Sequence, residues 1–279
     1  MEKIGLPMPV LRTPTVDPGE EFTAHSEDAL LDTFDRRARD LRISLTDFCN
    51  LRCTYCMPEE GVEFMSRDSA MSRDEIVRFV RIAVEKFGVD QVRFTGGEPL
   101  TRKDINDIIA GVAALEPRPN IALTTDAIGL DKRAAGLKAA GLDRINVSLD
   151  TVDPQIFETM TRRPFLRRVL EGIDGAKAAG LSPVKINAVL LPGINDAQAP
   201  DLLQWCLEQD LHLRFIEQMP LDAGHSWDRT SMITAADIFA LLEPRFVLTP
   251  DSAPRNGAPA EKFLVADRRD PERILGDVG

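Results

Sequence analysis

Residues 41–56 read LRISLTDFCNLRCTYC, an alternating run that ends in three closely spaced cysteines. Leu41, Ile43 and Leu45 alternate with polar residues, which is typical of a β-strand with one face against a hydrophobic core. Beyond this stretch, strand-type runs alternate with helix-type runs as far as about residue 219. A repeated strand–helix order predicts a parallel sheet with right-handed crossovers.

The sequence predicts six such units. The expected strands are Leu41–Asp47, Gln91–Gly96, Ile121–Thr125, Arg144–Asp150, Val184–Leu190 and Leu213–Met219. The expected helices cover residues 72–86, 103–115, 131–140, 166–179 and 197–209, and a further helix begins at Thr234. Six units are fewer than the eight of a closed barrel, so we predict an α/β fold, a partial (β/α)6 TIM-like barrel.

The composition is that of a globular protein, with 43% hydrophobic and 28% charged residues among 279. A formal charge of −11 argues against a nucleic-acid partner, so any anionic ligand needs local cations. No signal-peptide or membrane-spanning pattern occurs, so we expect a cytoplasmic location. We expect a flexible arm over residues 1–32, a core barrel over 33–244 and a remnant of a C-terminal region over 245–279. The charged end from Arg268 onward is expected to fray.

The alternation along the strands also predicts which side chains face the barrel interior. If the apolar residues meet the helices, the lumen receives four cations near the beginnings of their strands, in one layer: Arg42, Arg93, Lys185 and Arg214. Clustered charges in a lumen are costly unless they are compensated, which favours a bound polyanion such as a phosphate compound. The alternative is internal pairing with Asp47, Asp150 or Glu98, or snorkelling at the barrel rim.

Cys49, Cys53 and Cys56 form a C-x₃-C-x₂-C loop directly after the first strand, whereas Cys206 stands alone. Crowded thiols in such a chain indicate metal ligands rather than a disulfide framework. Three thiolates on one centre suit a [4Fe–4S] cluster in which one iron stays free to bind a small molecule. Zinc is the alternative, but structural zinc takes four ligands and no fourth Cys or His lies near this loop in the sequence.

The cysteine loop resembles the signature of radical S-adenosylmethionine (SAM) enzymes. Thr95–Pro99, with the sequence TGGEP, resembles their second motif, which receives the methionine end of SAM. More narrowly, four stretches resemble the GTP 3′,8-cyclases that begin molybdenum-cofactor biosynthesis. These stretches are Asp40–Asp47, Tyr55–Pro58, Asn146–Asp150 and Arg214–Met219. The resemblance covers about residues 33 to 266.

The resemblance implies roles for individual residues. The ligands of a single [4Fe–4S] cluster are expected to be Cys49, Cys53 and Cys56. The residues expected to contact SAM are Tyr55, Gly97, Ser148 and Met219. The residues expected to contact GTP are Arg42, Arg93, Thr124 and Lys185, with Arg214 nearby. No catalytic side chain is assigned, because the cluster and SAM carry the radical chemistry.

The implied activity is that of a lyase. The reduced cluster cleaves SAM to a 5′-deoxyadenosyl radical, which removes the 3′ hydrogen of GTP, and C3′ then joins C8 of guanine. The implied product is (8S)-3′,8-cyclo-7,8-dihydroguanosine 5′-triphosphate. The implied partners are GTP and a reductant protein such as flavodoxin or ferredoxin, with no nucleic acid and no membrane. The sequence leaves a homodimer open.

The chain departs from the family pattern in three respects. Family members carry a second C-x₂-C…C set, and no such set occurs up to Gly279; Cys206 lies on an apolar helix face. Residues 124–127 read TTDA where the family usually has TTNG, and Gln91 stands where it often has a basic residue. We therefore expect intact SAM and triphosphate sites with impaired cyclase turnover. The alternatives are a non-catalytic SAM- and GTP-binding paralogue and a radical SAM enzyme for another phosphorylated substrate.

Overall fold

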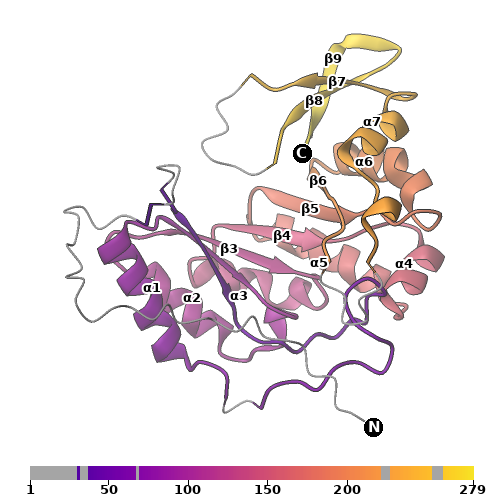
Figure 1. The fold of residues 1–279 in the computed structure, drawn as a ribbon. Coiled ribbons are helices and arrows are strands. Elements are labelled where there is room, and N and C mark those ends of the chain that lie inside the picture. Colours follow the sequence, from indigo (N-terminus) through magenta and orange to yellow (C-terminus); the bar gives the residue numbers. More distant parts are fainter. Residues whose placement is uncertain (1–29, 32–36, 67–68, 221–226, 253–259) are drawn as a thin grey trace, which may run out of the picture.

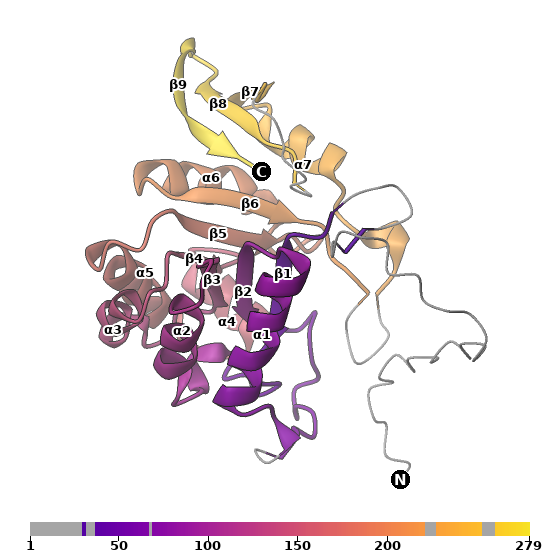
Figure 2. The same cartoon turned by 90° about the vertical axis from the view of Figure 1, so that its left-hand side faces the viewer.

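The computed structural model describes residues 30–31, 37–66, 69–220, 227–252 and 260–279 of the chain. The predicted arm over residues 1–32 therefore lies almost entirely outside the described residues. Within the described residues, a nine-stranded sheet forms the centre, in the order β1-β2-β3-β4-β5-β6-β9-β8-β7. Strands β1 to β6 are parallel, and the helices between them cover one face of the sheet (Figures 1 and 2). This arrangement confirms the predicted partial barrel.

The elements of the barrel agree closely with the prediction. The parallel strands are β1 (Asp40–Ser44), β2 (Gln91–Thr95), β3 (Asn120–Thr125), β4 (Arg144–Ser148), β5 (Val184–Val189) and β6 (His212–Ile216). The helices are α1 (Arg73–Phe87), α2 (Ile105–Ala113), α3 (Ala134–Ala139), α4 (Pro154–Thr161), α5 (Leu166–Ala178), α6 (Ala199–Glu208) and α7 (Ala235–Leu242). Short 3₁₀ turns lie at Pro99–Thr101, Leu130–Lys132, Asp196–Gln198 and Arg229–Ser231. Among the helices of the described residues, none is long and apolar enough to cross a membrane.

Helix α1 shows how the local sequence sets these bounds. The Ser72 side chain accepts a hydrogen bond from the backbone N–H of Glu75, and the Glu75 carboxylate accepts one from the N–H of Ser72. This reciprocal pair is a capping box, which satisfies two backbone donors at the helix start. Gly88 ends the helix with a φ of 66°, a left-handed conformation that glycine adopts without a steric penalty.

The predicted strand alternation is confirmed on the central strands. On β2, Val92 and Phe94 are fully buried beneath the helices, whereas Arg93 between them is half-buried on the opposite face. On β5, Ile186 is fully buried and Lys185 is half-buried in the same alternating pattern. The apolar face therefore builds the core, and the polar face is left to line the lumen.

The carboxyl-terminal part extends the sheet beyond β6. Strands β7 (Phe246–Pro250), β8 (Phe263–Asp267) and β9 (Asp270–Val278) pair antiparallel, and β9 also pairs with β6 (Figure 1). The prediction that the chain frays after Arg268 is wrong. The backbone N–H of Gly279 donates to Leu213 O at 3.0 Å, and the N–H of Phe215 donates to Gly279 O at 2.9 Å. These bonds fix a strand whose charged composition had suggested disorder.

Helix α5 packs so closely against the end of β3 that Gly172 leaves no room for a side chain. A Cβ atom at Gly172 would lie 2.0 Å from the backbone oxygen of Ala127. We expect Gly172→Ala to lower the free energy of unfolding by about 3 kcal/mol, because the backbone itself must shift. Urea denaturation measures this difference.

The matched control is Gly136→Ala on α3, where a Cβ would meet only the end of the Asn106 side chain, at 3.0 Å. That side chain can move, and alanine favours a helix, so we expect a change of less than about 1 kcal/mol. Equal denaturation midpoints for the two variants would contradict the packing assigned to Gly172.

Candidate active site

The three clustered cysteines lie in the loop beyond the carboxyl end of β1. Cys49 and Cys53 are half-buried, Cys56 is exposed, and all three are free thiols. Within the described residues, no three His, Cys, Asp or Glu side chains converge closely enough to hold a metal ion as they stand. The structure nevertheless brings the three thiols close enough for their charges to interact, since Cys49 and Cys56 both act on Cys53. The chemistry of this donor set, three thiols from one loop, fits a cluster that leaves one iron without a protein ligand.

Two arginines hold the backbone of the cysteine loop. Arg52 Nη1 donates to the carbonyl oxygen of Cys49 at 2.7 Å. Arg162 Nη1, at the end of α4, donates to the carbonyl oxygens of Arg52 and Met57 at 2.8 and 3.0 Å. Helix α4 was not among the predicted helices. It supports the loop that carries the thiols.

Burial keeps the thiols protonated in the absence of a cation. Burial raises the pKa of Cys49 to about 11, and burial with the nearby charge of Asp150 raises the pKa of Cys53 well above its usual value. Burial also raises the pKa of Cys56. Because the thiolate is the metal-binding form, a positively charged iron centre is what would stabilise the deprotonated loop.

The second motif lies directly against the cysteine loop. Gly97 N–H donates to Thr46 O at 2.7 Å, and Glu98 N–H donates to Phe48 O at 2.7 Å. A Cβ on Gly97 would lie 2.2 Å from Phe48 O, so only glycine permits this approach. The residue expected to contact SAM therefore adjoins the loop expected to hold the cluster.

Glu98 joins β2 to β3 through a buried carboxylate that is 1% exposed. It accepts hydrogen bonds from the backbone N–H groups of Leu100 and Asp126 and from the hydroxyl of Thr125. Asp126 is itself buried, and its Oδ2 atom has no hydrogen-bond partner among the described residues. Burial, followed by the charge of Glu98, raises the pKa of Asp126 to about 8. The departure from asparagine thus creates a buried pair of carboxyl groups.

This pair predicts a pH dependence of stability. The pKa of Asp126 is near 3.8 in the unfolded chain and about 8 in the folded chain, so the folded state binds more protons between these values. The contribution of Asp126 is therefore most favourable below about pH 4 and is lost as the pH rises to about 8. We expect Asp126→Asn to flatten this decline and to raise the free energy of unfolding at pH 8 by about 2 kcal/mol.

Chemical denaturation at pH 5, 6.5 and 8 measures this effect. Asp107→Asn is the matched control, because Asp107 is an exposed carboxylate on α2. Asp107→Asn should leave the pH dependence of the free energy of unfolding the same as in the unsubstituted chain. An identical pH slope for the Asp126→Asn variant and the unsubstituted chain would contradict the assignment.

The other residues expected to contact SAM lie at or near the carboxyl edge of the sheet. The Tyr55 hydroxyl donates to Oδ2 of buried Asp150 at 2.7 Å, which ties the cysteine loop to the end of β4. Ser148 is exposed at the last position of β4. Met219 is 54% exposed beyond β6. The structure thus gathers Tyr55, Gly97 and Ser148 at one edge, whereas Met219 lies in the segment that leaves β6.

A group of mutually repelling cations occupies the polar face of the sheet. Burial lowers the pKa of Lys185, and the charges of Arg214, Arg144 and Arg93 lower it further. Burial and the charges of Arg93 and Arg144 likewise lower the pKa of Arg214. These shifts show that three of the predicted lumen cations lie close enough to interact. Arg42 stands opposite Arg93 in the β1–β2 register but is exposed on the edge strand.

The alternative of pairing with Asp47, Asp150 or Glu98 is wrong within the described residues, although one cation pairs with a different carboxylate. Arg93 Nη2 lies 3.0 Å from Oδ2 of Asp40. Within the described residues, Lys185 and Arg214 form no ion pair. Two of the half-buried cations therefore have no carboxylate within ion-pair distance in this part of the chain, although the charge of Asp277 acts on Lys185.

The four predicted cations do not share one hydrogen-bonded row of the sheet. Strand pairing places Arg42 beside Arg93, Lys185 beside Asn146, and Arg214 beside Asn187. The Lys185 and Arg214 pairs lie on successive rows, because each strand is staggered relative to its neighbour. Sequence reasoning also missed Arg144, although the parity of β4 places it on the same face as Asn146.

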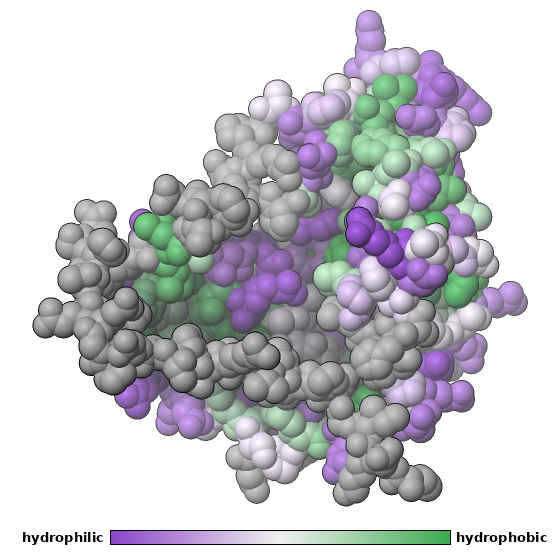
Figure 3. Space-filling view, viewed as in Figure 1, coloured by the Kyte–Doolittle hydropathy of each residue, from purple (hydrophilic) through white to green (hydrophobic). Residues whose placement is uncertain are grey.

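Thr124 lies on the same face, between the two ends of the lumen. Its Oγ1 accepts a hydrogen bond from Asn146 Nδ2 at 3.4 Å. Figure 3 shows hydrophilic residues at the floor of a hollow in the middle of this side of the molecule. The predicted GTP-binding residue thus belongs to a polar interior surface.

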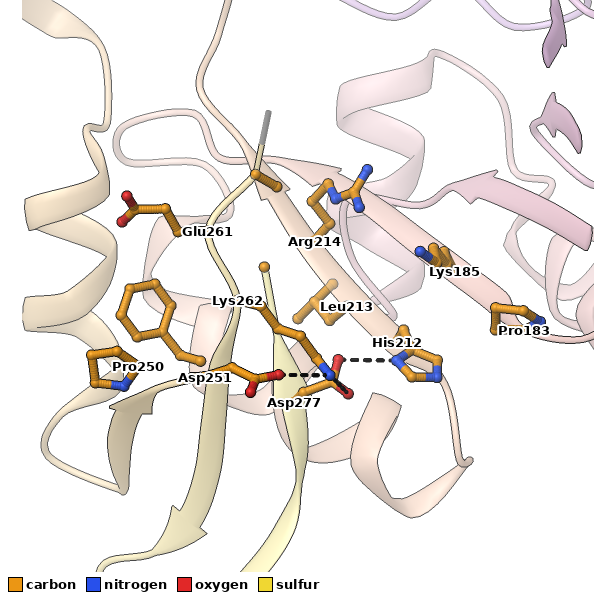
Figure 4. A pocket seen from close by; sticks show the side chains of 13 residues that line it. Pro183, Lys185, His212, Leu213, Arg214, Pro250, Asp251, Glu261, Lys262 and Asp277 are labelled. Atoms are coloured by element: carbon orange, nitrogen blue, oxygen red, sulfur yellow. Dashed lines mark hydrogen bonds and ion pairs between the residues drawn. The ribbon is translucent and has the colours of Figure 1, made fainter. Parts of the chain in front are cut away.

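A cavity of about 520 Å³ lies between β5, β6 and the C-terminal strands. Lys185 and Arg214 line it from neighbouring strands, and Lys262 and Asp277 lie opposite them (Figure 4). Lys262 Nζ lies 3.2 Å from Asp277, and Asp277 lies 2.9 Å from His212 Nδ1. This network joins β9 to β6, and Lys185 and Arg214 line the cavity beside it.

Comparison with known proteins agrees with this geometry. The family model described as the radical SAM superfamily matches residues 43–206. A GTP 3′,8-cyclase of Streptomyces coelicolor is 58% identical over 237 residues, which cover 85% of this chain and 70% of the relative. A GTP 3′,8-cyclase of Paenarthrobacter nicotinovorans is 59% identical over 239 residues, which cover 86% of this chain and 67% of the relative.

The solved structures show the same fold at low identity. Streptococcus suis SuiB bound to S-adenosylmethionine superposes with a TM-score of 0.57 and 21% identity, over 74% of this chain and 46% of SuiB. Methylornithine synthase superposes with a TM-score of 0.54 and 15% identity, over 74% of this chain and 62% of that protein. The chain belongs to the radical SAM superfamily, the enzymes that use a [4Fe–4S] cluster and SAM, and within it to the GTP 3′,8-cyclases.

Proposed function

We propose that this chain binds SAM at the cysteine-loop edge and GTP in the lumen, and acts as a GTP 3′,8-cyclase in molybdenum-cofactor biosynthesis. The observation that carries the proposal is the group of half-buried cations on the polar face, of which Lys185 and Arg214 form no ion pair within the described residues. A triphosphate supplies the negative charge that these side chains lack. The two relatives named above, at 58% and 59% identity, carry the same activity in their names.

The cofactor side of the site is formed by the cysteine loop and its neighbours. Cys49, Cys53 and Cys56 would hold the cluster, and bound cluster and SAM would supply the radical chemistry. The chain contributes the framework: the arginine-bound loop backbone and the Gly97 contact fix the loop against β2. The proposed SAM contacts are Tyr55, Gly97, Ser148 and Met219. Orientation of this kind is what a protein adds to a cofactor's own chemistry.

The substrate side is formed by the lumen face of the strands. The proposed GTP contacts are Arg42, Arg93, Thr124, Lys185 and Arg214. The cations neutralise phosphate oxygens, and guanidinium groups can do so with two parallel hydrogen bonds. The buried Nε of Arg93 has no hydrogen-bond partner within the described residues, which leaves it a donor for a phosphate oxygen. Phosphate binding by these cations, at the end of the lumen opposite the cysteine loop, directs the ribose toward the cofactor edge.

We further propose that the Asp126–Glu98 carboxyl pair beside the second motif slows turnover relative to family members that carry asparagine at this position. Ala127 adopts a φ of 64°, a left-handed conformation that is costly for alanine. The electron donor in this proposal is a small reductant protein such as flavodoxin or ferredoxin, in the cytoplasm, where thiols stay reduced.

Anaerobic reconstitution with iron and sulfide, followed by titration calorimetry and product analysis, tests the proposal. We expect GTP to bind more tightly than GMP and to stimulate 5′-deoxyadenosine release from SAM, with little cyclic product. Stimulation by another nucleotide but not by GTP would indicate a different phosphorylated substrate. SAM and GTP binding without any 5′-deoxyadenosine would indicate a non-catalytic paralogue.

A further inference from the structure

Arg144, at the first position of β4, carries a positive charge whose hydrogen-bond acceptors are neutral. Its guanidinium donates to the side-chain oxygen of Asn120 and, at 3.0 Å, to Oε1 of Gln91. Both acceptors are amides, and within the described residues no carboxylate forms an ion pair with Arg144. The two amides therefore hold the side chain in place without neutralising it.

The strand register brings Arg144 into the group of lumen cations. Arg93 pairs with Ala122 across β2 and β3, and Ala122 pairs with Arg144 across β3 and β4. The two arginines thus flank a single alanine on the same face of the sheet. Neighbouring strands are about 4.8 Å apart, and the small, fully buried Ala122 side chain lies between the two long side chains. An oxyanion bound between the guanidinium groups of Arg93 and Arg144 could accept hydrogen bonds from both side chains.

Two further observations point to an anion bound between Arg93 and Arg144. The buried Nε of Arg93 has no hydrogen-bond partner within the described residues, although Nη2 of the same side chain contacts Asp40. Burial and the charge of Arg93 lower the pKa of Arg144 despite the opposing charges of Asp40 and Asp143, and the charge of Arg144 acts in turn on Lys185 and Arg214. Four cations repel one another here, and an anion would relieve that repulsion.

Arg144 lies at the end of the lumen opposite the cysteine loop. It begins β4, and it borders a surface depression at the amino-terminal opening that is also lined by Arg118 and Asn120. A nucleotide whose ribose reaches toward the cofactor edge would extend its last phosphate to this end. Gln91, which stands where relatives often carry a basic residue, serves here as the neutral acceptor that aims the Arg144 guanidinium.

We propose that Arg144, positioned by Gln91 and Asn120, is a further substrate-binding residue that contacts the terminal phosphate of the nucleoside triphosphate. This inference rests on the proposed GTP site and adds to it a residue that sets the preference for triphosphate over monophosphate. A guanidinium anchored on two amides is rigid, so little conformational freedom is lost when it binds phosphate.

Calorimetry on the reconstituted chain with GTP, GMP and inorganic tripolyphosphate tests the inference. We expect Arg144→Gln to weaken GTP and tripolyphosphate binding about tenfold and to leave GMP binding within about twofold. Gln91→Glu should weaken GTP binding in the same direction, because it gives Arg144 a carboxylate partner while leaving the arginine in place. Arg118→Gln is the matched control, since Arg118 lines the same depression but already pairs with Asp143 at 2.9 Å.

The outcomes separate this inference from the proposed function. If the unsubstituted chain binds GTP no more tightly than GMP, the GTP site and this inference both fail. If the unsubstituted chain binds GTP tightly and Arg93→Gln weakens it, but Arg144→Gln leaves the GTP-to-GMP preference unchanged, only this inference fails. A purely structural role of Arg144 would alter unfolding and all three affinities alike, and that result would overturn the inference as well.

Discussion

Cys53→Ala should leave the reconstituted chain almost without iron and lower GTP-dependent release of 5′-deoxyadenosine at least about 1,000-fold. Cys53 is the middle thiol of the loop, and burial raises its pKa well above the usual value. Without it, two thiols remain, and a cubane cluster needs three ligands of this kind to stay bound in the loop. Because the cluster supplies the electron for SAM cleavage in this family, its loss removes the chemistry rather than slowing it.

Iron analysis and the visible absorbance of the anaerobic protein measure this effect. Cys206→Ala is the matched control, because Cys206 is a fully buried free thiol on α6. Its substitution should lower the free energy of unfolding by about 1 kcal/mol and leave the iron content unchanged. Iron retained by Cys53→Ala, or lost from Cys206→Ala without unfolding, would contradict the assignment of the cysteine loop.

Arg214→Gln should weaken GTP binding about 100-fold and at the same time stabilise the empty protein by about 1 kcal/mol. Arg214 is half-buried, forms no ion pair within the described residues and is repelled by Arg93 and Arg144. Removal of the charge relieves that repulsion in the absence of ligand but deletes a phosphate contact in its presence. Opposite effects on stability and on function are typical of a binding site that carries unbalanced charge.

Thermal unfolding with and without inorganic tripolyphosphate measures both effects in one experiment. The unsubstituted chain should gain stability from the anion, and Arg214→Gln should gain much less. Arg167→Gln, on the exposed face of α5 where Arg167 pairs with Glu171, should respond to the anion like the unsubstituted chain. If Arg214→Gln lowers stability without ligand, Arg214 has a structural role and the unbalanced-charge account is wrong.

The strand alternation allowed much of the barrel to be predicted from the sequence. Buried Val92 and Phe94 flank Arg93 as the period of two requires, because a strand can hide only alternate side chains from water. Helix α1, which was predicted over residues 72–86, is bounded by its cap at Ser72 and its terminal Gly88, and both are local signals. Features set by one strand or one helix turn can therefore be found in the sequence alone.

Features that depend on how strands are staggered could not be predicted in this way. The β5–β6 register pairs Arg214 with Asn187 and pairs Lys185 with His212. The sequence alone does not determine this register. The partner of Arg93 is Asp40, at the start of the neighbouring strand, although Asp47, Asp150 and Glu98 were the expected candidates. Each of those three carboxylates is instead occupied by other donors, including Met65 N–H, Tyr55 and Thr125 respectively.

The C-terminal strands show a second limit of sequence reasoning. The segment from Asp270 is charged, yet it forms β9, because backbone hydrogen bonds to β6 and β8 fix it regardless of side-chain polarity. Hydrophobic alternation therefore did not predict β9, because this strand lacks a regular apolar face. Arg144 was missed for a simpler reason, since the alternation of β4 was followed only from Ile145 onward.

The most direct test of the account is isotope transfer from GTP that carries deuterium at the ribose 3′ position. The anaerobically reconstituted chain, supplied with SAM and a reductant, is expected to release 5′-deoxyadenosine that contains this deuterium. That result would place the ribose of GTP at the cofactor edge of the same lumen whose cations bind its phosphates. 5′-Deoxyadenosine formed from SAM in the presence of bound GTP but free of deuterium would contradict the account.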